Sequence, residues 1–94
     1  MPQIARLGDR CSGHGCFPSR PNDQASSNVL CNNKGIHRKT DHWQSHCCVG
    51  CHDSVLAEGS NTVIINGLEC GRIGDPVACG SSVMQGSSNT FAGG

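Results

Sequence analysis

Histidine and cysteine side chains recur at one point of an internal repeat in this sequence. Each copy of the repeat contains an Arg-x-(Gly/Thr)-Asp motif. A metal-ligating side chain follows the motif's aspartate by five residues in the first two copies and by four residues in the third. The aspartates and the side chains that follow them are Asp9 and His14, Asp41 and His46, and Asp75 and Cys79. Imidazole and thiolate groups at matching positions of a repeat indicate a shared metal site.

A fourth ligand for such a site is His52, which follows His46 by six residues. Three histidines and one cysteine suit tetrahedral Zn²⁺, and coordination by protein side chains alone is typical of structural zinc. Iron or cobalt can bind the same donors. We predict a structural metal ion, zinc first and iron second, that supplies much of the folding free energy. The predicted ligands are His14, His46, His52 and Cys79.

The remaining histidines and cysteines occupy no common position in the repeat. His37 and His42 are expected to be solvated loop side chains. Cys16 and Cys48 each follow a predicted histidine ligand by two residues. The cysteines outside the predicted site are Cys11, Cys16, Cys31, Cys47, Cys48, Cys51 and Cys70. Buried thiols, disulfides and a second, cysteine-rich metal site all remain open for them, because pairing cannot be deduced from sequence.

Cys48-Val49-Gly50-Cys51-His52 matches the C-x-x-C-H signature of c-type haem attachment. Haem attachment would require export, and the N-terminus lacks the apolar stretch of a secretory signal. A haem-carrying redox protein, with Met84 as the distal ligand, is therefore kept as an alternative. The sequence contains no second C-x-x-C knuckle, no H-E-x-x-H and no deaminase signature, and no cysteine is set apart as a nucleophile. We therefore expect that the chain is not an enzyme.

Short β-strands must position these side chains. The Arg-x-(Gly/Thr)-Asp motifs lie 32 and 34 residues apart, and a polar turn followed by a short apolar stretch alternates with them. These second elements are Ser26-Ser27-Asn28-Val29-Leu30, Gly59-Ser60-Asn61-Thr62-Val63-Ile64-Ile65-Asn66-Gly67 and Gly86-Ser87-Ser88-Asn89-Thr90-Phe91-Ala92-Gly93. Asn66-Gly67 is a strong hairpin signal. Helix signals are poor, and residues 51–58 could make two turns at most.

We therefore predict an all-β fold, a small cone of short β-hairpins stapled by the metal site near its apex. Three modules would surround a pseudo-three-fold axis, with one copy split between the two termini. The chain has zero net charge and 3% aromatic residues, so neither a nucleic-acid-binding surface nor a large aromatic core is expected. No stretch is apolar enough to span a membrane. Without a secretory signal, we expect synthesis in a reducing cytoplasm, as one domain of residues 1–94.

The order of these motifs resembles the PAAR-repeat family over essentially the whole chain. The matching segments are Arg6-Leu7-Gly8-Asp9, Gly13-His14-Gly15, the strand and turn of residues 59–67, Gly71-Arg72-Ile73-Gly74-Asp75, Ala78-Cys79-Gly80 and Gly86-Ser87-Ser88-Asn89-Thr90-Phe91. Two segments depart from the pattern: Thr40 replaces a glycine, and Lys34-Gly35-Ile36-His37 replaces an Asn-Gly turn. Any one motif is weak, whereas their order is specific.

The resemblance implies a cone whose broad base docks on the blunt end of a trimeric β-helical spike, as in type VI secretion systems and contractile phage tails. It implies a zinc ion held by three histidines and one cysteine, which carry over onto His14, His46, His52 and Cys79. Tips of this family let effectors ride the spike through fused extensions or adaptors. With no extension at either end, this chain is expected to be a bare tip. It would be assembled in a virion tail or secretion apparatus, delivered across the target envelope, and in transient contact with the target membrane.

In this interpretation a single chain meets a three-fold partner by presenting similar strand edges from each module. The predicted edges lie near Val29-Leu30, Val63-Ile64-Ile65 and Phe91. The docking residues predicted within them are Val29, Val63, Ile65 and Phe91. A disulfide-rich secreted binding module is a further alternative, because eight cysteines can also staple a small secreted domain.

Overall fold

Six short strands, paired into three antiparallel hairpins, make up the regular structure of the chain. In this computed structural model, which describes residues 1–93, the strands are β1 (Leu30–Cys31), β2 (Lys34–Gly35), β3 (His42–Cys48), β4 (Gly50–Val55), β5 (Ile64–Ile65) and β6 (Leu68–Glu69). The hairpins pair β1 with β2, β3 with β4 and β5 with β6. This confirms the predicted all-β class.

Residues 51–58, where the sequence allowed two helical turns at most, form no helix. Residues 51–55 lie in β4 and pair with β3, and Cys47 and Cys51 face each other across this hairpin. Residues 1–93 contain no helix, and so none that is long and apolar enough to cross a membrane.

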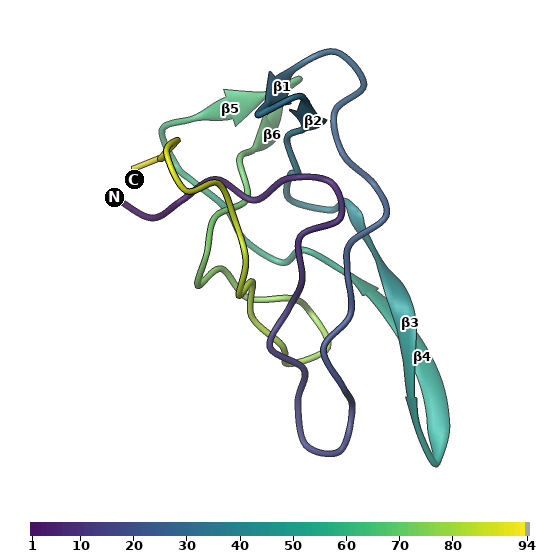
Figure 1. The fold of residues 1–94 in the computed structure, drawn as a ribbon. Coiled ribbons are helices and arrows are strands. Elements are labelled where there is room, and N and C mark those ends of the chain that lie inside the picture. Colours follow the sequence, from purple (N-terminus) through teal and green to yellow (C-terminus); the bar gives the residue numbers. More distant parts are fainter. Residues whose placement is uncertain (94) are drawn as a thin grey trace.

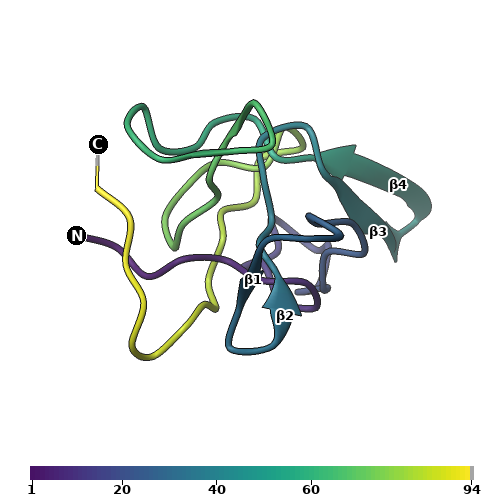
Figure 2. The same ribbon diagram turned by 90° about the horizontal axis from the view of Figure 1, so that it is seen from above.

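The molecule is elongated, with principal extents of 37 × 24 × 22 Å. Figure 1 shows β1, β2, β5, β6 and both chain termini at one end, which we call the base. The β3–β4 hairpin and the loop of residues 12–19 extend toward the opposite end, which we call the apex. Seen from above in Figure 2, the β1–β2 hairpin, the β5–β6 segment and the two terminal segments surround a common centre.

A closed ring of backbone hydrogen bonds marks the pseudo-three-fold axis. Ala5, His37 and Gly71 each directly precede the arginine of one Arg-x-(Gly/Thr)-Asp motif. The amide of Ala5 donates to the carbonyl of Gly71 (2.9 Å), the amide of Gly71 to His37 (2.8 Å) and the amide of His37 to Ala5 (3.0 Å). Each module therefore donates to one neighbour and accepts from the other, as the sequence repeat predicted.

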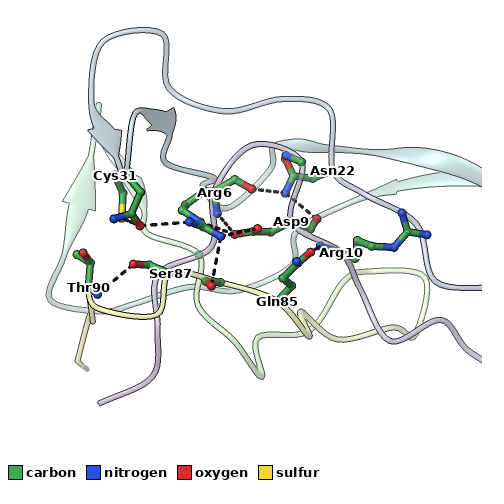
Figure 3. Close-up of polar contacts among 12 residues, drawn as sticks. Arg6, Asp9, Arg10, Asn22, Cys31, Gln85, Ser87 and Thr90 are labelled. Carbon is green, nitrogen blue, oxygen red and sulfur yellow. Dashed lines mark hydrogen bonds and ion pairs between the residues drawn. The ribbon is translucent and has the colours of Figure 1, made fainter.

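Each Arg-x-(Gly/Thr)-Asp motif is a turn that closes on itself and also reaches a second module. The aspartate amide donates to the arginine carbonyl, and the guanidinium pairs with the carboxylate. The pairs are Arg6–Asp9 (2.9 Å), Arg38–Asp41 (2.8 Å) and Arg72–Asp75 (2.9 Å). The Nη1 atoms of these arginines donate to Asn32, Asn66 and Gly93, respectively. Figure 3 shows the first copy, with Arg6 between Asp9 and the segment that carries Cys31. The buried carboxylates are thus paired, and the modules are joined.

The third residue of each motif has a left-handed backbone. The φ angle is +87° at Gly8, +76° at Thr40 and +92° at Gly74. Glycine adopts such angles freely, whereas a β-branched side chain is strained there. Thr40 is therefore held in an unfavourable conformation by the turn that the Arg38–Asp41 pair closes.

Replacing Thr40 with glycine is expected to raise the free energy of unfolding by about 0.5–1 kcal/mol, because the strain relieved exceeds the entropy that glycine adds to the unfolded chain. Urea denaturation of the two proteins measures the difference. Gly74→Ala is the matched control: its new Cβ would meet nothing within 4 Å, so only backbone strain changes and stability should fall. A less stable Thr40→Gly protein would contradict this account.

A buried serine begins the second element of every module. Its hydroxyl accepts hydrogen bonds from the amides two and three residues further on, which tightens the polar turn before the apolar stretch. The three serines are Ser26, Ser60 and Ser87. The alternating element seen in the sequence is therefore a repeated turn that starts each base hairpin.

The two chain termini together form the third base hairpin. The amide of Ala92 donates to the carbonyl of Pro2 (3.0 Å), and the amide of Ile4 donates to Thr90 (2.9 Å). The bonds that match the second of these in the other modules run from Ile36 to Val29 and from Cys70 to Val63. Figure 1 shows both termini side by side at the base. The predicted split of one module between the termini is confirmed.

Two small apolar clusters fill the interior, and each draws on all three modules. The base cluster consists of Ile4, Cys31, Ile36, Cys70 and Ala92, with Val29, Val63 and Ile65 packed against it. The apical cluster consists of Ala5, Cys11, Trp43, Leu56, Val77 and Val83, with Ile73 and Cys79 packed against it. Apolar clusters of this size give a small domain little stability, so a cross-link at the apex would add to it.

His37 is fully buried, so the expectation of a solvated side chain is wrong. Its Nδ1–H donates to the carbonyl of Gln24 (2.8 Å), and its ring packs edge-on against Trp43. The matching positions around the axis hold Ala5 and Gly71, whose small size leaves room for one imidazole. The burial follows from the three-fold packing and not from the local sequence.

Burial lowers the pKa of His37 below its ordinary value. Below about pH 6.5 the unfolded chain therefore binds more protons at His37 than the folded chain does. The contribution of His37 to the free energy of unfolding falls as the pH falls. Urea denaturation between about pH 8 and pH 5 should show a smaller decline in the free energy of unfolding for His37→Leu than for the unchanged protein. An equal decline in both would contradict a neutral, buried His37.

His42 serves as a control because its contribution to stability changes with pH in the opposite direction. Hydrogen bonds from its ring to Asp53 and Asp23 raise the pKa of His42. The stabilisation from these pairs is present at low pH and is lost as the pH rises through the raised pKa. His42→Gln should therefore steepen the decline toward low pH, where His37→Leu flattens it.

Candidate metal centre

The four predicted metal ligands converge at the apex. One donor atom from each of His14, His46, His52 and Cys79 lies within 4.8 Å of all the others. The Nε2 atom of His14 is 3.2 Å from that of His46 and 3.1 Å from that of His52, and the last two are 2.6 Å apart. Nitrogens bound to one tetrahedral zinc ion at about 2.0–2.1 Å lie roughly 3.3 Å from each other. The arrangement therefore fits a single ion with small adjustments.

Each module supplies its ligands from a different turn or strand. His14 lies in a tight turn: its amide donates to the carbonyl of Phe17, and the amide of Phe17 donates to the carbonyl of His14. His46 in β3 and His52 in β4 are direct cross-strand partners, and a register shift between Trp43 and His46 separates this pair from the buried tryptophan. Cys79 lies in the short turn that the Val77 amide closes on the Ser81 carbonyl. Three hairpins of different length thus deliver four donors to one point.

The imidazoles are oriented as metal ligands require. The Nδ1–H of His46 donates to the carbonyl of Pro18 (2.8 Å), which leaves the Nε2 lone pair facing the other ligands. Partial burial and the neighbouring rings of His46 and His14 lower the pKa of His52, which favours its neutral form. Three converging Nε2 atoms cannot all be satisfied by protons shared among themselves. A cation at their centre satisfies all three.

Phe17 and Arg20, which were not predicted from the sequence, support the cluster. The Phe17 ring packs on the rings of His14, His46 and His52, with centroid distances of 4.8, 4.9 and 4.3 Å. Arg20 is only 4% exposed, and its guanidinium lies over Trp43. Its side chain donates to Gln44 O (2.7 Å), Cys11 Sγ (3.0 Å) and Cys79 Sγ (3.4 Å). In the sequence, only their closeness to His14 could have indicated that Phe17 and Arg20 lie near the site.

Arg20 also bears on the charge of the cysteine donor. Burial alone would raise the pKa of Cys79, but the amide of Ser81 and the guanidinium of Arg20 outweigh it and lower the pKa. A thiolate is the form that binds metal. Cys79, the thiol that lies within reach of the three imidazoles, is therefore prepared to serve as a ligand.

The other cysteines divide into disulfides and buried thiols. Cys16 is bonded to Cys48, and Cys47 to Cys51. The free, buried thiols are Cys11, Cys31 and Cys70. Burial raises the pKa of Cys70 to about 11, which makes it unreactive. Both Cys48 and Cys51 are thus in disulfides, and residues 1–93 form no pocket for a porphyrin, so the c-type haem alternative does not fit.

At the base, each module has a large exposed apolar side chain four residues after its buried serine. They are Leu30, Ile64 and Phe91, with 58%, 53% and 46% of their surface exposed. Of the four docking residues predicted from sequence, Phe91 belongs to this set. The other three, Val29, Val63 and Ile65, are half-buried and pack against the base cluster. We call Leu30, Ile64 and Phe91 the base ring.

Comparison with known proteins agrees with this architecture. The family model described as the PAAR motif matches residues 22–85. Two curated relatives from Pseudomonas aeruginosa are 48% identical to the chain over 40 residues. They are the NAD(P)(+) glycohydrolase toxin Tse6 of strain PAO1 and the (p)ppApp synthetase toxin Tas1 of strain UCBPP-PA14. These matches cover 43% of this chain and only 9% of each relative. The family model, by contrast, spans most of the chain, and we conclude that this protein belongs to the PAAR motif family.

Proposed function

We propose that the protein is the tip of a trimeric β-helical spike in a contractile injection machine, either a type VI secretion system or a phage tail. The observation that carries this proposal is the base ring. Leu30, Ile64 and Phe91 occupy matching positions in three modules of one chain. A single chain with three similar apolar contacts can cap a three-fold partner without a symmetry mismatch.

The apical site in this proposal holds a structural zinc ion, with iron as the second choice. His14, His46, His52 and Cys79 are the proposed ligands. When bound, the ion joins the turns of all three modules at the narrow end of the molecule. The metal is a staple in this role, and all four positions around it are filled by protein.

The proposed role is mechanical and not catalytic. A pointed, cross-linked apex concentrates the force of sheath contraction and resists local unfolding as the spike crosses the target envelope. The enzymatic names of Tse6 and Tas1 belong to those proteins, of which the shared segment is 9%. Carriage of an effector, through a fused extension or an adaptor, is a proposal that follows from the family and from these two toxins.

The proposed assembly is one domain of residues 1–94, built in the cytoplasm and seated on a spike that is delivered to a target cell. The two disulfides also suit the alternative of a secreted binding module. The base ring and the apical histidine cluster favour the tip, because a secreted module stapled by disulfides needs neither.

Native mass spectrometry of the chain mixed with a trimeric β-helical spike tests this function. We expect one chain per spike trimer and one zinc ion per chain. Binding of three chains per trimer, or no binding to the spike at all, would overturn the proposed role. Absence of metal with intact spike binding would overturn only the proposed site.

A further inference from the structure

Four cysteines surround the candidate metal centre without belonging to it. Cys47 directly follows His46, and Cys51 directly precedes His52. Cys16 and Cys48 follow His14 and His46 by two residues. Every one of these cysteines is therefore within two residues of a proposed ligand.

The two disulfides connect the segments that carry the histidines. Cys16–Cys48 joins the loop of His14 to strand β3, across a sequence separation of 32 residues and a Cα–Cα distance of 5.8 Å. Cys47–Cys51 joins β3 to β4 at a point where the two residues are already cross-strand partners. The first bond therefore links two modules, whereas the second reinforces one hairpin.

Most non-covalent contacts between the segment after His14 and the β3–β4 hairpin lie near the start of β3. The amide of Gln44 donates to the carbonyl of Pro21, the amide of Asp23 donates to that of His42, and the Arg20 guanidinium lies over Trp43. The His46 ring bonds to Pro18, and the Arg20 side chain bonds to Gln44. Closer to the ligands, Phe17 packs on the histidine rings, a contact that depends on the cluster itself. The bond from Cys16 to Cys48 adds a covalent link at the far end of β3, beyond His46, where it restrains the separation of the ligand-bearing segments.

The apical cysteines are also accessible to thiols and disulfides from solution. Cys16, Cys47 and Cys51 are exposed, and Cys48 is half-buried. Cys11, Cys31 and Cys70, by contrast, are buried in the core. Reduced thiols beside His46 and His52 would compete with the imidazoles for a soft metal ion, and disulfide formation removes that competition.

We propose that Cys16–Cys48 and Cys47–Cys51 form a redox-operated clasp over the metal centre. The clasp is open in a reducing compartment, where the ligand segments separate and the ion exchanges. It closes under oxidising conditions and traps the ion. This inference rests on the proposed metal site.

Closure is thiol–disulfide exchange with a small disulfide such as oxidised glutathione. For each bond, two protein thiols become one protein disulfide, and one molecule of the small disulfide becomes two thiols. Two electrons and two hydrogens pass from the protein to the oxidant, so no other reactant is needed. A phosphine reductant reverses the step and becomes a phosphine oxide, with its oxygen supplied by water.

Zinc release from the full chain into an excess of a coloured chelator tests the clasp. The protein is loaded with one equivalent of zinc and held either oxidised with glutathione disulfide or reduced with the phosphine, and intact mass verifies two disulfides or none. We expect release from the oxidised form to be about tenfold slower, because opening of the ligand loops is restrained. Equal release rates from the two forms would overturn the clasp while leaving the metal site intact.

Two double variants separate the bonds. Cys16→Ser with Cys48→Ser should lose most of the redox difference. The matched control, Cys47→Ser with Cys51→Ser, should keep most of it, because backbone pairing of β3 and β4 already joins those positions. If the Cys47 and Cys51 variant lost the redox difference and the Cys16 and Cys48 variant kept it, the clasp would not be the bond between modules. A chain that binds no zinc in either redox form would overturn the metal site, and the clasp with it.

Discussion

Replacement of His14 by alanine together with Cys79 by serine is expected to remove one equivalent of bound zinc and to lower the free energy of unfolding by about 5 kcal/mol or more. The two ligands come from different modules, so their loss leaves two donors on a single hairpin. Two imidazoles from one hairpin cannot join the three modules. Elemental mass spectrometry of protein purified without added metal measures the content, and thermal unfolding measures the stability.

His42→Ala is the matched control for this experiment. His42 lies on the same strand as His46, but it pairs with Asp23 and Asp53 outside the cluster. The variant should keep its zinc. A double variant that retains the metal would show that the ligands are elsewhere, and one that loses the metal without losing stability would show that the ion is not a staple.

Charging the base ring is expected to abolish docking on the spike without affecting the metal. Phe91→Asp alone should weaken binding by about thirtyfold, because an apolar contact is replaced by a charge that must be desolvated. Adding Leu30→Asp and Ile64→Asp should reduce binding below detection. Titration of each variant against an immobilised trimeric spike gives the change in Kd, and zinc content shows that the apex is intact.

Val49→Asp provides the control at the opposite end. Val49 is a fully exposed apolar residue between β3 and β4, at the tip of the apical hairpin. Its replacement should leave docking unchanged. If Val49→Asp weakens binding as strongly as Phe91→Asp, the docking surface is not the base. If Phe91→Asp binds the spike with unchanged affinity, the docking model is wrong.

The repeat could be read from the sequence because its contacts are local. The arginine and aspartate of each motif are three residues apart and pair within one turn, as Arg6 and Asp9 do. The serine turns are equally local, since each hydroxyl bonds to amides two and three residues away. Features of this kind depend on residue type and short spacing, so their order along the chain predicted three modules and the family.

The proposed ligand set could also be predicted from the sequence, because a three-fold arrangement brings matching positions of a repeat together. His14, His46 and Cys79 follow their motifs at nearly the same offset, and the structure brings them within reach of one another. Their loops nevertheless differ in length. The β3–β4 hairpin is long enough to contribute two histidines, whereas the Cys79 turn contributes one thiol.

The outward faces of the base hairpins could not be predicted. β1 and β5 are only two residues long, too short for an alternating pattern to show which side chain points to solvent. Val29, Val63 and Ile65, which were predicted as docking residues, pack partly inward. Leu30 and Ile64, which lie in the predicted edges but were not among the predicted docking residues, are exposed. The orientation is decided by the base cluster, to which all three modules contribute.

The amino-acid sequence by itself thus determined the turns, the three-fold repeat and the residues able to hold a metal, because short-range hydrogen bonds and fixed offsets encode them. The tertiary structure alone decided the burial of His37, the contact of Arg20 with Cys79 and the pairing of Cys16 with Cys48. Each of these joins residues from different modules, or places one on the common axis. Their distances exist only after the modules have packed around that axis, and no local pattern of residue types specifies them.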